Sequence, residues 1–262
     1  MKLKIYQIDS FTDKVFGGNP AAVCPLDQWI SDELMQNIAT ENNLSETAFY
    51  VKDDTEYQIR WFTPTMEVNL CGHATLAAAF VLFNYENYQN KLINFVSPRS
   101  GLLTVKKQGD LLVMNFPSDI LKKIDSFSEL TNGFEIVPNE VLKGKSDYMF
   151  VFENEDQIKG ITPKFNEIAK LNSLGVIVTA KGDNVDFVSR FFAPQCGINE
   201  DPVTGSAHTT LTPYWAKQLG KNELAAVQLS ERRGYLKCNY LDDRVEISGH
   251  AKLYLTGEIY VN

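Results

Sequence analysis

The 262-residue chain has few cysteines, few histidines and no long apolar run. Its four cysteines are widely spaced and form no CxxC pair, so free thiols are expected, and only Cys71 with His73 approaches metal-ligand spacing. We therefore expect no metal. No apolar stretch approaches the roughly 20 residues that span a bilayer, and the N-terminus lacks the apolar core of a signal peptide. These absences favour a cytoplasmic protein with no membrane partner.

Clustered basic residues are also missing. The chain has 25 Lys and Arg against 33 Asp and Glu, a formal net charge of −8. Nucleic acids and anionic membranes bind patches of Lys and Arg, so neither is an expected partner. The remaining composition, 44% hydrophobic and 22% charged, is ordinary for a soluble globular protein of one large domain or two small ones.

What the sequence does contain is a pattern that occurs twice. A gap-free match over 27 positions relates the two halves at a constant offset of 130, as the following pairs illustrate: Ile38 and Ile168, Leu44 and Leu174, Arg60 and Arg190, Phe62 and Phe192, Pro64 and Pro194. After the proline the second copy gains three residues, and the offset becomes 133 for Glu67 and Glu200, Gly72 and Gly205, His73 and Ser206. We infer two similar domains, related by a pseudo-twofold axis that brings two helix N-termini to one cleft.

Hydrophobic periodicity and turn residues predict the elements of each half. In residues 1–116 we expect strands at 3–10, 47–51, 57–62, 93–105 and 110–116, a turn at 17–20, and helices at 30–43 and 71–83. In residues 117–252 we expect strands at 148–154, 174–180 and 185–192, and a helix at 162–172 that Thr162 caps. A final strand is expected within 253–262, and periodicity does not decide which half it joins.

The helix predicted at 71–83 is apolar on all sides, which is typical of a buried core helix. Its first N–H groups, near Gly72 and His73, need acceptors that a ligand carboxylate can supply. Gly72 also allows such a ligand to approach the backbone closely. Gly205 has the matching position in the second half.

Function is expected where the two copies differ. Glu46 matches Val176, His73 matches Ser206, and Val68 matches Asp201. Glu46, which follows Ser45 at the entrance of a predicted strand, is thus a carboxylate present on one side only. A carboxylate, an imidazole, a hydroxyl and a second carboxylate together can move a proton, and a shielded Glu is suited to a general base that returns what it takes.

Four segments in order, GGNPAAV, NLSETAF, FTPTMEVNLCGHATLAAA and EDPVTGSAH, resemble the PhzF-type phenazine-biosynthesis isomerase family. The resemblance covers essentially the whole chain. It implies the α+β diaminopimelate epimerase-like fold: two domains, each a barrel-like mixed β-sheet around a central helix, with the active site between them. It also implies a homodimer and no metal or organic cofactor.

The same resemblance assigns roles to residues. The catalytic glutamate of the family's SETAF motif falls on Glu46, the histidine of GHAT on His73, and the aspartate and serine of DPVTGSAH on Asp201 and Ser206. It implies that the glutamate carries a proton between carbons of the substrate. The epimerases of this fold instead use two facing cysteines, but here Cys71 is matched by Thr204, whose hydroxyl is too weak an acid to replace a thiolate.

The resulting hypothesis is an isomerase that acts on a small carboxylate-bearing, cyclic or unsaturated metabolite. Glu46 would shuttle the proton, assisted by His73, Asp201 and Ser206, and the substrate would contact six further residues: Asn19, Ser45, Cys71, Gly72, Thr204 and Gly205. Two alternatives stay open, a non-catalytic metabolite-binding or oligomeric protein with the same cleft and, less favoured, a cysteine-type epimerase. His208 and His250 are expected to be structural and surface residues.

Overall fold

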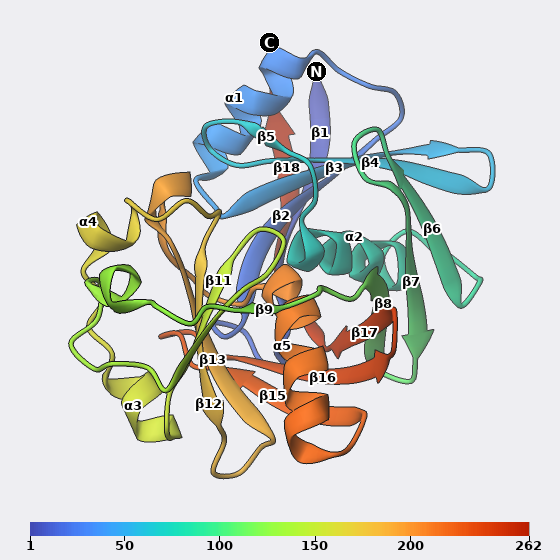
Figure 1. Ribbon diagram of the computed structural model, residues 1–262. Coiled ribbons are helices and arrows are strands. Elements are labelled where there is room, and N and C mark those ends of the chain that lie inside the picture. Colours follow the sequence, from blue (N-terminus) through green and yellow to red (C-terminus); the bar gives the residue numbers. More distant parts are fainter. Residues whose placement is uncertain (262) are drawn as a thin grey trace. The chain divides into compact units, whose positions relative to one another are not determined.

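The computed structural model describes residues 1–261 and divides into two compact units (Figure 1). The first unit comprises Met1–Asn115 and the C-terminal stretch that begins at Ser248, and the second comprises Phe116–Ile247. The sequence predicted a domain boundary after residue 116 and did not decide which domain the final strand joins. In the structure the chain returns to the first unit at Ser248 rather than at residue 253, because the last strand pairs with the first strand of the chain.

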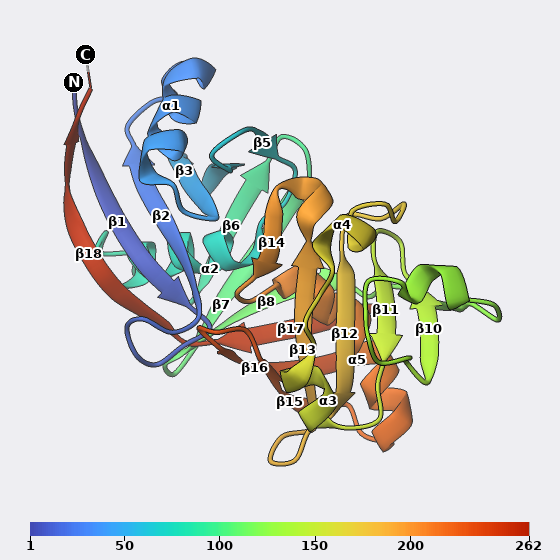
Figure 2. The same ribbon diagram turned by 90° about the vertical axis from the view of Figure 1, so that its left-hand side faces the viewer.

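The first unit is built on a mixed sheet. Its strands are β1 (Lys2–Ser10), β2 (Asn19–Leu26), β3 (Glu46–Asp53), β4 (Glu56–Phe62), β5 (Glu67–Val68), β6 (Leu92–Ser97), β7 (Gly101–Gln108), β8 (Leu111–Pro117) and β18 (Ala251–Tyr260). β1 lies between β18 and β2 and is antiparallel to both (Figure 2). The succession continues with β2 parallel to β3, β3 antiparallel to β4, β4 parallel to β6 and β6 antiparallel to β7.

Two helices accompany this sheet, α1 (Asp32–Asn42) and α2 (Gly72–Asn84). α1 begins where predicted, because the Ser31 hydroxyl accepts a hydrogen bond from the Leu34 N–H. α2 packs against β1, β2 and β3, and its residues from His73 to Ala79 are all buried, as its uniformly apolar sequence predicts. Over residues 1–261, no helix has the length and apolar character needed to cross a membrane.

The second unit also has a mixed sheet. Its strands are β9 (Lys122–Lys123), β10 (Glu140–Lys143), β11 (Tyr148–Val151), β12 (Val176–Lys181), β13 (Phe187–Ala193), β14 (Ile198–Asp201), β15 (Glu223–Gln228), β16 (Gly234–Leu241) and β17 (Arg244–Gly249), the last of which runs on into the first unit. Its helices are α3 (Glu155–Gly160), α4 (Phe165–Ile168), α5 (Gly205–Leu219) and the 3-10 turns η1 (Ser128–Thr131) and η2 (Pro194–Cys196). α5 packs against β15 and β16.

The two units use the same succession of strand pairings. In the second unit β10 is antiparallel to β11, β11 parallel to β12, β12 antiparallel to β13, β13 parallel to β15 and β15 antiparallel to β16. The senses repeat those from β1 to β7 in order, with β14 beside β13 as β5 is beside β4. The segment in which the second copy gains three residues follows Pro194, the first residue of η2.

A bidentate Arg–Glu ion pair occurs at matched positions of both units. In the first unit Arg60 donates from Nε and Nη2 to the two oxygens of Glu67, at 2.7 and 2.9 Å. In the second unit Arg190 binds Glu200 through the same atoms at the same two distances. Each pair ties a long strand to the short strand that leads to the central helix, α2 or α5. Paired geometry of this kind fixes orientation as well as adding energy.

Three of the elements predicted from the sequence differ from those in the structure. The turn expected at 17–20 ends earlier, since β2 begins at Asn19, and Pro20 is tolerated because it lies at the start of the strand. The single strand expected at 93–105 is two strands, β6 and β7, because Pro98 lacks an N–H and Gly101 adopts a positive φ of 68°. The helix expected at 162–172 shrinks to α4, because beyond Ile168 the Lys170 and Leu171 N–H groups bind carbonyls three residues back rather than four.

The close approach of Gly18 to Ser10 gives a test of the fold. Gly18 has a φ of 62°, and a Cβ there would overlap the Ser10 carbonyl, whereas Gly109 has a φ of 61° and open space around it. We predict that Gly109→Ala lowers the free energy of unfolding by about 1 kcal/mol through the positive φ alone. Gly18→Ala should cost roughly 3 kcal/mol, because overlap is added. Urea unfolding measures both, and equal losses would contradict the packing described.

Candidate active site

Three of the predicted residues meet in the first unit, where a strand start and a helix start come together. Glu46 is the first residue of β3, Cys71 is the N-cap of α2, and His73 lies in the first turn of that helix. The imidazole Nε2 is 3.1 Å from Glu46 Oε2, and the Cys71 sulfur is 3.5 Å from the imidazole Nδ1. The His73 and Glu46 side chains are only 5% and 12% exposed. The arrangement is a shielded acid–base pair with a thiol beside it.

Two further residues hold this histidine. Asn19 is fully buried at the start of β2, and its amide nitrogen lies 3.2 Å from His73 Nδ1. The contact of Asn19 with a substrate, expected from the sequence, stays a prediction, and the structure adds its contact with the imidazole. Ser10, at the end of β1, donates a hydrogen bond of 2.8 Å to the His73 carbonyl. Sequence reasoning missed Ser10, since its partner is 63 positions away and no local pattern marks it.

The protonation of the pair follows from its surroundings. Burial disfavours the imidazolium form of His73, but its contacts with the Cys71 sulfur and the Glu46 carboxylate favour it, and the net effect raises the pKa of His73 above its usual range. The counter-charge comes from the Glu46 carboxylate, 3.1 Å from Nε2, because a neutral thiol supplies none. Burial raises the pKa of the Cys71 thiol to about 11. Cys71 is therefore a neutral thiol near pH 7, which does not suit the base of a two-cysteine epimerase.

In the second unit, Asp201 and Thr204 lie together. Both are buried, and the Thr204 hydroxyl donates to an Asp201 carboxylate oxygen. Gln228, on β15, accepts from the Thr204 N–H at 2.9 Å and donates to the Asp201 carbonyl at 2.7 Å. The sequence did not single out Gln228, because its partners lie 24 and 27 positions away and no local pattern marks it. The Thr204 hydroxyl is thus bound to a carboxylate at the position that matches Cys71.

The remaining predicted residues of this unit differ in exposure. Ser206 is exposed in the first turn of α5, whereas Gly205, the first residue of the helix, is buried. His208 is fully buried, and its Nδ1–H donates to the Thr204 carbonyl at 2.8 Å. Burial lowers the pKa of His208 to about 4. His208 is therefore a neutral packing residue near pH 7, which is the structural role expected for it.

The structure thus brings together Glu46, Cys71, His73 and Asn19 in one unit, and Asp201 with Thr204 in the other. Gly72 and Gly205 open the two central helices, and half-buried Ser45 precedes β3. The trio of Glu46, Cys71 and His73 also has its potential ligand atoms within 4.8 Å of one another, so it is a candidate metal-binding group within residues 1–261.

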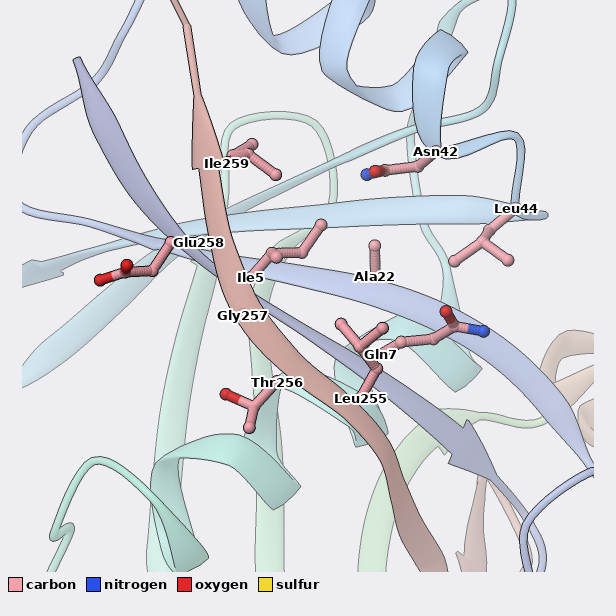
Figure 3. Close-up of a pocket in the computed structure, with 10 residues that line it drawn as sticks. All are labelled: Ile5, Gln7, Ala22, Asn42, Leu44, Leu255, Thr256, Gly257, Glu258 and Ile259. Atoms are coloured by element: carbon pink, nitrogen blue, oxygen red, sulfur yellow. The ribbon is translucent and has the colours of Figure 1, made fainter.

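A pocket of about 390 Å³ opens elsewhere in the first unit, beside β1, β2 and β18 (Figure 3). Its lining includes Ile5, Ala22, Leu44 and Leu255, and none of the predicted site residues. Its carboxylate, Glu258, points away from the other labelled side chains and pairs with Lys2 at 2.7 Å. The pocket therefore lacks groups for proton transfer, and the chemistry is better placed at Glu46 and His73.

Similar proteins are known from both sequence and structure. The family model described as phenazine biosynthesis-like protein matches residues 8–257. A Pseudomonas aeruginosa protein named as an uncharacterized isomerase is 49% identical over 261 residues, which is 100% of both chains. A crystal structure of a phenazine biosynthesis PhzF family protein from Enterococcus faecalis is 47% identical, with a TM-score of 0.97 and full coverage of both chains.

The fold extends to more distant proteins. A hydroxyproline epimerase from Agrobacterium vitis, solved with trans-4-hydroxy-L-proline, aligns with a TM-score of 0.64 over 98% of this chain and 92% of its own, at 9% identity. At that identity the likeness concerns the fold alone. The family resemblance and the α+β epimerase-like fold expected from the motifs are both confirmed.

Buried His208 predicts a pH dependence of stability. Its pKa is about 4 when folded and 6.5 when unfolded, so between these values the unfolded chain binds a proton that the folded chain excludes. Stability from this site is therefore lost as the pH falls from 6.5 to 4, by roughly 3 kcal/mol. We predict that His208→Asn, which keeps a donor for the Thr204 carbonyl, flattens urea-unfolding stability over this window relative to wild type. Equal pH profiles for the two proteins would contradict a buried neutral His208.

Proposed function

This chain belongs to the phenazine biosynthesis-like protein family, and from that premise we propose that it moves a proton within a small metabolite, with Glu46 as the shuttle. Its family and fold make it an enzyme of the isomerase or epimerase kind. The proposed substrate carries a carboxylate and is cyclic or unsaturated. No organic cofactor or metal takes part in the proposed reaction.

One observation carries the proposal: a shielded carboxylate lies 3.1 Å from an imidazole Nε2. Glu46 would take a proton from a carbon of the substrate, the electron pair of that C–H bond would move into the conjugated system, and Glu46 would return the proton to another carbon. No atom is gained or lost. His73, as the neighbouring cation, would stabilise the negative charge that develops on the substrate.

The position of Glu46 supports a shuttle that works alone. β3 begins at Glu46, and the matched strand β12 begins at Val176, which is fully buried. The first unit therefore has a carboxylate where the second has an alkyl group. Buried, neutral Cys71 and the hydrogen-bonded hydroxyl of Thr204 count against the two-cysteine alternative. A single base that both removes and returns the proton fits this asymmetry.

Binding of the substrate is proposed to use the helix starts and the polar residues of the second unit. The first N–H groups of α2, from Gly72, would hold the carboxylate, because helix N-termini attract anions. Asp201 and exposed Ser206 are proposed as further donors and acceptors to the substrate. Asn19 is proposed to act through His73, whose ring it contacts. A homodimer stays a prediction, which sedimentation of the intact protein would test.

Replacing the shuttle gives the direct test. Small carboxylates are first screened for thermal stabilisation, because a ligand that binds the folded state raises its apparent stability. With a converted ligand in hand, we predict that Glu46→Gln lowers kcat by about 10² to 10⁴-fold, the usual contribution of a general base, while thermal stabilisation by the ligand persists.

Glu56→Gln is the matched control, since Glu56 is also the first residue of a strand, β4, but lies outside the site. It should leave kcat near the wild-type value. A Glu46→Gln protein that folds and turns over at the wild-type rate would overturn the assignment of Glu46.

A further inference from the structure

The trio of Glu46, Cys71 and His73 has a second property besides proton transfer. A carboxylate oxygen, a thiol sulfur and an imidazole nitrogen all lie within 4.8 Å of one another. We propose that these three side chains form an inhibitory binding site for a divalent cation of the zinc class. The inhibition rests on the proposed function, because the ion would occupy the atoms that carry the proton, whereas binding itself does not.

The separations suit a small tetrahedral ion. Zinc binds sulfur at about 2.3 Å and nitrogen or oxygen at about 2.0–2.2 Å, so its ligand atoms lie roughly 3.3–3.6 Å apart. His73 Nε2 is 3.1 Å from Glu46 Oε2 and 4.0 Å from the Cys71 sulfur. The sulfur lies nearer Nδ1, at 3.5 Å, so the Cys71 side chain must turn toward Nε2 for one ion to bind all three atoms. Rotation of the flexible Glu46 side chain can bring its oxygen nearer the sulfur without moving the backbone.

The three ligands are held by regular structure. Cys71 and His73 are the N-cap and a first-turn residue of α2, and Glu46 lies opposite Ala21 in the pairing of β3 with β2. Ser10 fixes the His73 carbonyl, and Asn19 contacts Nδ1, which leaves Nε2 as the nitrogen directed to Glu46.

The ligand types select the class of ion. A thiolate with an imidazole favours zinc and its softer relatives, whereas magnesium and calcium prefer sites made of oxygen. Three protein ligands also leave the fourth position of a tetrahedral ion open for water or a substrate carboxylate. An ion there would use the lone pairs of Glu46 and His73, and proton transfer would stop until a chelator removed it.

Cobalt(II) is the probe, because a cobalt–thiolate bond gives a charge-transfer absorption that reports the sulfur ligand directly. Chelator-treated full-length protein is titrated with Co²⁺, and Zn²⁺ and Mg²⁺ are then tested as competitors. We expect one Co²⁺ per chain with a thiolate band that Zn²⁺ removes and Mg²⁺ does not. Cys71→Ser should lose the band and weaken Co²⁺ binding at least tenfold.

Cys196→Ser is the matched control, since Cys196 is an exposed thiol of the second unit and should not affect the band. If Cys71→Ser fails to fold, as judged by circular dichroism, Glu46→Gln replaces it and should retain the band but bind Co²⁺ at least tenfold more weakly. A band that survives in Cys71→Ser, disappears in Cys196→Ser or never forms would overturn the proposal. Because absorption needs no substrate, an inactive protein that shows the band would contradict the proposed function alone.

Discussion

The paired Arg–Glu contact is the constraint on which each unit of this protein depends. Arg60 with Glu67, and Arg190 with Glu200, connect a long strand to the loop before a central helix. Both contacts are partly buried and use the same atoms at the same distances. By fixing that loop, the contact sets where the first turns of α2 and α5 lie, and the candidate catalytic groups are found on those turns or beside them. We interpret the two contacts as the mark of an internal duplication.

The two units share this arrangement and differ in the side chains at matched positions. The first unit places a carboxylate at the start of β3 and an imidazole in the first turn of α2, and it shields both from water. In the second unit the matched residues are Val176 and Ser206. Low exposure strengthens the interaction between Glu46 and His73, because less water competes with it. The short distances between these side chains and Cys71 are also the basis of the proposed zinc-class cation site.

Much of this was accessible from the sequence, and the exceptions have physical reasons. The constant offset between copies matched the arginines, the glutamates and the two helix starts, because those residues recur at fixed spacing, but it did not predict that each arginine binds its glutamate. Ser10, Gln228 and the contact of Asn19 with His73 were not accessible, since each contact joins residues that are 24 to 63 positions apart. α4 is short because the Lys170 and Leu171 N–H groups form tighter i→i−3 bonds, which helix propensity does not predict. The residues that position the candidate site are therefore harder to predict from the sequence than the candidate catalytic residues.

The central claim is that a single base relocates a proton, and hydrogen exchange with solvent tests it most directly. A carboxylate that stabilises the protein is incubated with it in D₂O, and the product is examined by NMR and mass spectrometry. The account predicts a product with a shifted double bond and at most one deuterium, located at the carbon that receives the proton. Inversion at a single carbon without relocation, or tight binding with neither conversion nor exchange for every such ligand, would contradict it.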